Sequence, residues 1–247
     1  MSTIGFGIGR SAASNALREQ EWNLYAKIPA LYLISDAERV GEKRFVDIVS
    51  RAVEGGLSML QLREPRWPVE RVVRFAELLA ERFPEEFLLT VNYRPKSEDF
   101  DDLYRLLSTG VRGVHLGRCA ATAVTDIREQ LEESHLVGFS AHTLEEVDDA
   151  FRLGADYVSY SPVYSPISKS ESVSSHGIDG LRVVCSQTTG PVYALGGINA
   201  ERAGLTRNAG AAGVAVIGAI VDSANPASAT RLLLARVNNK PPTRPPR

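Results

Sequence analysis

Eight short apolar segments recur along the chain, and this rhythm constrains the fold more than any other feature of the sequence. Such runs, without strict polar alternation, are typical of strands buried on both faces, as in parallel sheets. Eight strands that alternate with helices predict an α/β fold, a (β/α)8 TIM barrel. An open doubly wound sheet is the alternative, but it usually has fewer strands and a glycine-rich turn directly after the first. The predicted strands are residues 31–34, 58–62, 87–91, 113–116, 136–139, 157–160, 191–195 and 213–216.

Amphipathic stretches of helical period separate the predicted strands. The expected helices are residues 44–53, 69–81, 97–107, 124–132, 144–153, 180–186 and 200–208, with a closing helix over 227–237. Several of them lead into the next strand through glycine, the residue that most readily adopts the left-handed conformation at a helix C-terminus. We expect such glycines at Gly55-Gly56, Gly110, Gly154, Gly190 and Gly210.

The ends of the chain differ from its middle, which predicts three parts. Residues 1–28 form an N-terminal extension with an extra helix over 13–27, and residues 29–237 form the barrel. Residues 238–247 are rich in proline and are expected to be a disordered tail, because proline continues neither a helix nor a sheet.

Charge and cysteine content exclude several functional classes. The 28 Lys and Arg residues nearly balance 30 Asp and Glu residues, so the chain lacks the basic excess of a nucleic-acid-binding protein. Two cysteines, Cys119 and Cys185, are too few for a disulfide scaffold or a zinc site, so we expect a reducing cytoplasm. No apolar run approaches the ~18 residues of a membrane span, so no membrane partner is expected. The sequence does not exclude a homo-oligomer.

The segments after the seventh and eighth predicted strands have the features of a phosphate site. In this architecture the active site lies at the C-terminal ends of the strands, and the last two loops commonly bind phosphate. Glycines there allow backbone N–H groups to approach an anion at a helix start, although they can also serve only as tight turns. The predicted phosphate-binding residues are Gly196, Gly197, Ile217 and Gly218. In the serine-rich segment 161–178, Ser168 and Lys169 are expected to close over the phosphate ester.

Polar side chains at other strand ends are candidates for substrate binding. They are Gln61, Arg63, Asn92, His115 and Ser140, although His115 can equally be a hydrogen-bonded core histidine. His142 is the candidate catalytic residue, because an imidazole with a pKa near 6.5 suits general acid–base work. The alternative is that His142 belongs to a helix start, with Thr143 and Glu146 forming a capping box.

Several motifs, taken in order, resemble the thiamine phosphate synthase and thiazole tautomerase superfamily. They include Gln61-Leu62-Arg63-Glu64, Gly113-Val114-His115-Leu116-Gly117, Ser140-Ala141-His142-Thr143 and Gly196-Gly197-Ile198-Asn199. The resemblance covers roughly residues 31–220 and implies the same barrel fold.

The resemblance implies a magnesium-dependent synthase that joins a pyrimidine pyrophosphate to a thiazole phosphate, with two aspartates as metal ligands. The matching positions here are Tyr93 and Ala120, and the lysine that often ends the Gln-Leu-Arg-Glu motif is Pro65. A phenol and a methyl group do not replace carboxylates as ligands of a hard cation. These substitutions favour the tautomerase branch, which isomerises a carboxythiazole phosphate without a metal or other cofactor.

In that interpretation His142 moves the proton, Gln61 and Arg63 hold the substrate carboxylate, and the partner is a small phosphorylated thiazole. Two alternatives remain. One is a thiamine phosphate synthase with magnesium held by Asp36, Glu64 or Asp101. The other is a non-catalytic family member that senses a phosphorylated ligand or acts as a regulatory partner.

Overall fold

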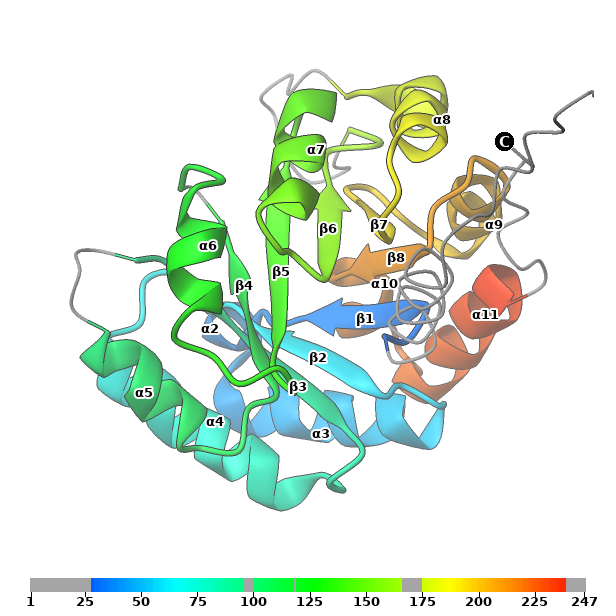
Figure 1. Ribbon diagram of the computed structural model, residues 1–247. Helices are drawn as coiled ribbons and strands as arrows, with labels where there is room; N and C mark the ends of the chain where they lie inside the picture. Colours follow the sequence, from blue (N-terminus) through cyan, green and yellow to red (C-terminus); the bar gives the residue numbers. More distant parts are fainter. Residues whose placement is uncertain (1–27, 96–99, 118, 166–174, 239–247) are drawn as a thin grey trace, which may run out of the picture.

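Eight parallel strands form a closed barrel in which each strand pairs with the next and β8 pairs with β1 (Figure 1). The computed structural model describes residues 28–95, 100–117, 119–165 and 175–238. The strands are β1 (Leu31–Ile34), β2 (Met59–Leu62), β3 (Leu88–Tyr93), β4 (Gly113–Leu116), β5 (Leu136–Ala141), β6 (Tyr157–Tyr160), β7 (Val192–Leu195) and β8 (Gly213–Val216). The barrel prediction is confirmed.

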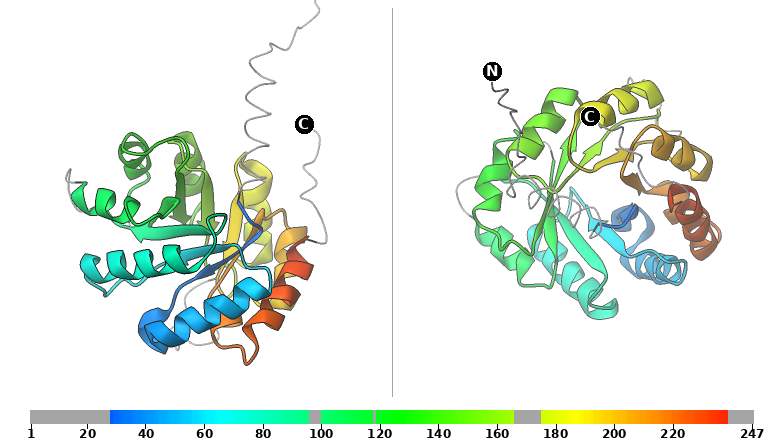
Figure 2. Two further views of the ribbon diagram at one scale, coloured as in Figure 1. Left: turned by 90° about the horizontal axis from the view of Figure 1, so that it is seen from below. Right: turned by 45° about the vertical axis from the view of Figure 1, so that its right-hand side comes forward.

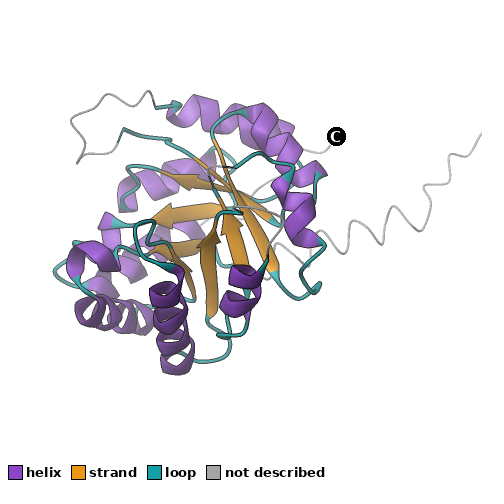
Figure 3. Cartoon of the chain, turned by 90° about the vertical axis from the view of Figure 1, so that its left-hand side faces the viewer, coloured by secondary structure: helices purple, strands orange, loops and turns teal. Residues whose placement is uncertain are grey.

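Helices surround the strands, as Figures 2 and 3 show. They are α2 (Ala37–Val40), α3 (Glu42–Glu54), α4 (Val69–Arg82), α5 (Asp101–Leu107), α6 (Ala123–Arg128), α7 (Leu144–Arg152), α8 (Gly177–Gln187), α9 (Ala200–Asn208), α10 (Gly218–Val221) and α11 (Pro226–Asn238). The sequence missed the short helices α2 and α10 and extended α6 too far. Within the described ranges, no helix is both long and apolar enough to cross a membrane.

Two predictions about the ends of the chain fall mostly outside the described residues. The expected N-terminal helix over 13–27 lies there, as do residues 239–247 of the expected tail. Asn238, which we assigned to the tail, is the last residue of α11.

Strands β3 and β5 are longer than their apolar runs. The ladder continues as far as the pairs Tyr93 with Leu116 and Ala141 with Tyr160. Polar side chains near these strand ends find partners inside the barrel, so the strand does not have to stop where the apolar residues stop. Asn92 and Ser140 therefore lie within strands.

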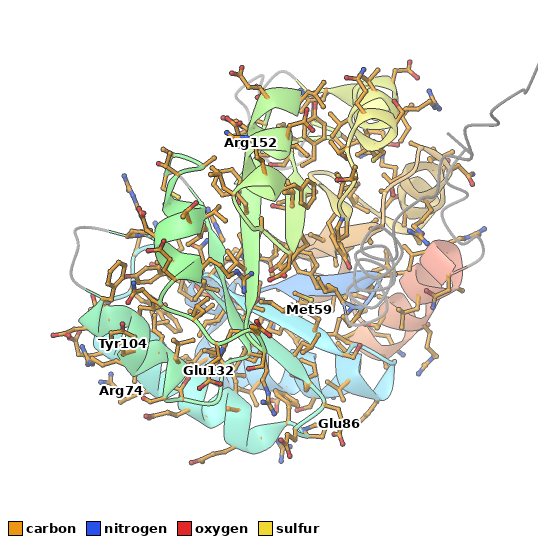
Figure 4. The ribbon with its side chains drawn as sticks, in the orientation of Figure 1. Met59, Arg74, Glu86, Tyr104, Glu132 and Arg152 are labelled. Carbon is orange, nitrogen blue, oxygen red and sulfur yellow. The ribbon has the colours of Figure 1, made fainter. Side chains whose placement is uncertain are left out.

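The barrel interior is filled by aromatic side chains that have space because some strand positions are glycine. The rings of Tyr32, Tyr157 and Tyr193 pack against one another with centroids 5.4 to 6.0 Å apart. A Cβ atom at Gly138 would lie 2.3 Å from Cζ of Tyr157, and one at Gly213 would lie 2.5 Å from Cε1 of Tyr193. The layer between strands and helices is aliphatic and aromatic, whereas Figure 4 shows Arg74 and Tyr104 at the periphery.

The helix-ending glycines agree with prediction at four positions, where φ lies between 89° and 106°: Gly56, Gly110, Gly154 and Gly210. Gly55 is right-handed, with φ −83°. Gly190 is not left-handed either, and a Cβ there would lie 2.2 Å from the Phe151 ring. Close packing, and not backbone handedness, explains Gly190.

A buried arginine attaches the closing helix to the barrel. Arg207 in α9 donates from Nε to the carbonyl of Val237 in α11 at 2.7 Å. The same guanidinium donates to the carbonyl of Ala211, just before β8. One side chain thus links α9, α11 and the start of the last strand.

Candidate active site

Gln61 lies in β2 and Arg63 is the first residue after this strand, whereas Leu62 between them packs in the layer between strands and helices. Gln61 is 1% exposed, and its Oε1 atom accepts no hydrogen bond from the described part of the chain. A buried acceptor without a donor is costly. Gln61 is therefore suited to accept a hydrogen bond from a ligand.

Asn92 and Ser140 converge above the end of β4. Asn92 Nδ2 donates to the carbonyl of His115 at 3.1 Å. A Cβ atom at Gly117 would lie 3.4 Å from Ser140 Oγ and 3.5 Å from Asn92 Nδ2. The structure therefore brings these two predicted substrate-binding residues together at the barrel mouth.

His115 lies beneath Ser140 in the barrel interior. It is 1% exposed, its Nδ1 lies 3.2 Å from the Tyr157 hydroxyl, and its Nε2 lies 2.9 Å from Ser140 Oγ. Burial, with a smaller contribution from the positive charge of Arg63, lowers the pKa of His115 to about 3. His115 is thus the neutral core histidine among our two alternatives, and direct contact with substrate stays a prediction.

His142 lies at the exposed rim, and both roles considered for it are compatible. Its Nδ1 is 2.6 Å from the carbonyl oxygen of Ser161, which can only accept, so Nδ1 carries a proton. In the neutral ring Nε2 is then the basic nitrogen. The capping box is present, since Glu146 N donates to Thr143 Oγ1 at 3.1 Å and the Glu146 carboxylate accepts from Thr143 N at 3.2 Å.

His176, for which the sequence predicted no role, is a second histidine at this rim. Its Nε2 lies 3.1 Å from the same Ser161 carbonyl, and its ring stacks on Tyr160 at 4.7 Å. His142 and His176 are separated by more than thirty residues. Nothing in their local sequences indicates that they share one acceptor.

The predicted phosphate-binding residues lie at the C-terminal ends of the neighbouring strands β7 and β8. Gly196 and Gly197 are both left-handed, with φ 102° and 59°, and Asn199 caps α9 by accepting from Arg202 N at 2.9 Å. Ile217 and Gly218 lead into α10. The first N–H groups of a helix lack intrahelical acceptors, so this arrangement suits an anion. Phosphate binding itself stays a prediction.

Arg202 is a further cation at this edge that the sequence analysis missed. One guanidinium nitrogen donates to the carbonyl of Gly197 at 2.7 Å, and the group lies 4.5 Å above the Tyr164 ring. The start of the serine-rich segment is also held, since Val163 N donates to the carbonyl of Leu195 at 2.8 Å. Ser168 and Lys169, predicted phosphate contacts, lie outside the described residues.

The described side chains at the positions expected to bind magnesium do not fit that ion. Tyr93 is 6% exposed and packs in the apolar core. The Glu64 carboxylate is already engaged as a helix cap, accepting from Ser35 Oγ at 2.6 Å and from the N–H groups of Ala37 and Glu38 at 2.7 and 3.0 Å. Across the described ranges, no three His, Cys, Asp or Glu side chains are grouped as metal ligands.

Comparison with known proteins yields one family. Residues 31–220 match the family model described as thiamine monophosphate synthase. Thiamine-phosphate synthase from Albidiferax ferrireducens is 33% identical over 200 residues, 79% of this chain and 86% of that protein. Putative thiamine-phosphate synthase from Geobacter sulfurreducens is 34% identical over 209 residues, 83% of this chain and 93% of that protein.

Solved structures agree. Thiamine phosphate pyrophosphorylase from Pyrococcus furiosus is 27% identical with a TM-score of 0.70, covering 87% of this chain and 98% of that one. 3-Hexulose-6-phosphate synthase from Salmonella typhimurium, at 15% identity and a TM-score of 0.69, shares the fold; the alignment covers 85% of this chain and 99% of that one.

The expectation of a tautomerase is wrong. The relatives that match most of this chain are named thiamine-phosphate synthases, and nothing in the comparisons indicates the tautomerase branch. Our expectation rested on Tyr93, Ala120 and Pro65, which lie on one side of the site. The similarity, by contrast, extends over all eight strands.

Proposed function

The chain belongs to the thiamine monophosphate synthase family, and on this premise we propose that it is a thiamine-phosphate synthase. The enzyme would transfer a pyrimidinylmethyl group, the pyrimidine ring together with its CH2, from diphosphate to the ring nitrogen of a thiazole phosphate. A C–N bond forms, the C–O bond to the diphosphate breaks, and the electron pair leaves with the diphosphate. The observation that carries the proposal is the 33–34% identity to named synthases over most of both chains.

The geometry of the mouth is suited to two anionic substrates. The loops after β7 and β8 would hold the thiazole phosphate through backbone N–H groups. Gln61, Asn92 and Ser140, on the other side of the mouth, would bind the pyrimidine, with Gln61 Oε1 accepting from one of its N–H groups. Holding both reactants in line supplies much of the rate enhancement of a bimolecular substitution.

The floor of this site is polar but uncharged. The neutral His115 ring orients the Ser140 hydroxyl, so the floor adds no charge of either sign. Charge for the anionic groups then comes from the rim, where Arg202 and Arg63 lie. We place the reaction in the cytoplasm, which accords with two free thiols, Cys119 and Cys185.

The test is product formation from the pyrimidine diphosphate and the thiazole phosphate, followed by chromatography. We expect thiamine phosphate and inorganic diphosphate in equal amounts. Asn92→Ala should lower the rate by about a hundredfold through lost positioning, whereas Arg74→Ala, on the outer surface of α4, should not change it. Binding of both substrates without turnover would refute the proposal and support a ligand-sensing role, which the substitutions at Tyr93 and Ala120 favour.

A further inference from the structure

We propose that two guanidinium groups, those of Arg63 and Arg94, hold the diphosphate in place of a divalent cation. The inference rests on the proposed function, since it concerns how this chain stabilises the leaving group. It begins from a disagreement: the family implies a magnesium ion, and the side chains at the matching positions do not fit one.

Among the described residues, the two positions that match the family aspartates carry no carboxylate, and the carboxylates of Glu64 and Asp36 are engaged. The position of the first family aspartate is the buried Tyr93, and the second is Ala120. Glu64 accepts three hydrogen bonds as the cap of α2. Asp36 accepts from Arg39 Nε at 2.5 Å. Over the part of the chain that the structure describes, a hard cation therefore finds no group of three carboxylate, imidazole or thiol ligands.

Arg94 directly follows Tyr93, the first substituted position, at the end of β3. Tyr93 ends β3 paired with Leu116, so Arg94 continues the chain beside Gly117. Arg94 is thus the first residue after β3, two residues beyond Asn92, whose side chain donates to the carbonyl of His115. Its side chain is exposed, and within the described ranges no carboxylate forms an ion pair with it.

The charge of Arg94 reaches the segment that follows β4. Burial raises the pKa of the Cys119 thiol, and the positive charge of Arg94 opposes this rise. Cys119 directly precedes Ala120, the second substituted position. Arg94 thus supplies positive charge to both places where the aspartates are missing.

Arg63 supplies the second cation from the neighbouring strand. Leu62 is the last residue of β2 and pairs with Val91, so Arg63 follows at the level of Asn92. Its positive charge contributes to the lowered pKa of the buried His115. The two arginines therefore flank Asn92 at the mouth of the barrel.

Guanidinium groups suit the chemistry of this leaving group. Each presents N–H donors in a fork that matches phosphate oxygens. When the C–O bond breaks, the electron pair and the developing negative charge go to the diphosphate, and no proton is transferred. Two fixed positive charges can stabilise that anion as one divalent cation would.

The test uses the full-length protein with inorganic diphosphate, titrated by calorimetry in EDTA and then with magnesium. We expect the wild type to bind diphosphate in EDTA. The affinity should fall about tenfold in Arg94→Ala and about threefold in Arg94→Lys, because lysine keeps the positive charge but lacks the paired N–H donors of the guanidinium group. The matched control is Arg74→Ala, which removes an exposed arginine on α4, and it should bind diphosphate as tightly as the wild type. Unchanged melting temperatures would show that all three variants are folded.

Two results would overturn the inference: diphosphate binding that requires magnesium, or equal affinities of the wild type and Arg94→Ala in EDTA. The companion synthase assay in EDTA and in magnesium separates this failure from failure of the proposed function. Product formed only with magnesium refutes the guanidinium inference and leaves the synthase. Arg94-dependent diphosphate binding in EDTA without product in either buffer supports the anion site and refutes the synthase.

Discussion

Replacing Gly138 with alanine should disrupt the packing beneath the active site. Gly138 lies in β5 directly between His115 on β4 and Tyr157 on β6. An added Cβ would lie 2.3 Å from Tyr157 Cζ and 2.5 Å from His115 Nδ1, far inside an ordinary contact. Both neighbours are buried by barrel strands and cannot swing into solvent.

The cost has two parts. Inserting a methyl group into a well-packed core destabilises a protein by about 1–3 kcal/mol. Moving either ring also breaks the 3.2 Å hydrogen bond between His115 and Tyr157, worth about 1 kcal/mol. We therefore expect the free energy of unfolding to fall by about 3 kcal/mol. For a domain of this size, that lowers the melting temperature by roughly 6–12 °C.

The assay is equilibrium urea denaturation followed by tryptophan fluorescence and circular dichroism. The matched control is the same substitution at Gly204 in α9, where an added Cβ would meet nothing within 4 Å beyond its chain neighbours and the adjacent backbone of its own helix. Because alanine is the better helix former, Gly204→Ala should raise stability by about 0.5–1 kcal/mol. A Gly138→Ala variant within about 0.5 kcal/mol of wild type would show that the interior is not tightly packed, and our reasoning would be wrong.

Three further predictions concern the site. Gly197→Ala should weaken binding of a thiazole phosphate about tenfold by calorimetry, because φ of 59° is unfavourable for alanine and its Cβ would lie 2.9 Å from the Ser165 carbonyl; unchanged affinity would argue against this loop as the anchor. Glu64→Gln should lower the free energy of unfolding in urea by about 1–3 kcal/mol, since a neutral amide can no longer accept all three hydrogen bonds of the α2 cap; a neutral effect would contradict that role. The third rests on His115, whose pKa falls from 6.5 to about 3 on folding, so the unfolded chain takes up more protons between these values and stability falls as pH falls. Between pH 7 and pH 5 the His115 contribution should lower the free energy of unfolding by about 2 kcal/mol, and this part of the decrease should be missing in His115→Asn. Equal decreases in the wild type and in His115→Asn would exclude His115 as the source.

The barrel could be predicted because its signal is local and repeated. Each apolar run is buried on both faces, and that requirement alone separates a parallel strand from its surroundings. The limits of β3 and β5 could not be read in the same way. They depend on hydrogen bonds from Asn92 and Ser140 to groups on other strands, which leave no periodic trace in the sequence.

The position of the candidate site in the fold could be predicted from the sequence, but the reaction at that site could be predicted less well. Strand ends identified Gln61, Asn92 and Ser140, because a barrel must gather them at one mouth. The shared acceptor of His142 and His176 required the fold, since the carbonyl of Ser161 belongs to a third segment. The prediction of a tautomerase was wrong because it relied on three substituted positions and did not take into account the similarity of the rest of the chain to synthases.

The buried Arg207 sets a boundary for shortening the protein. Its guanidinium donates to the carbonyl of Val237, one residue before α11 ends. Truncation after Asn238 keeps that acceptor in place, whereas truncation before Val237 removes it and leaves a buried cation with one fewer partner. Affinity tags and fusion partners at the C-terminus should accordingly be joined beyond Asn238.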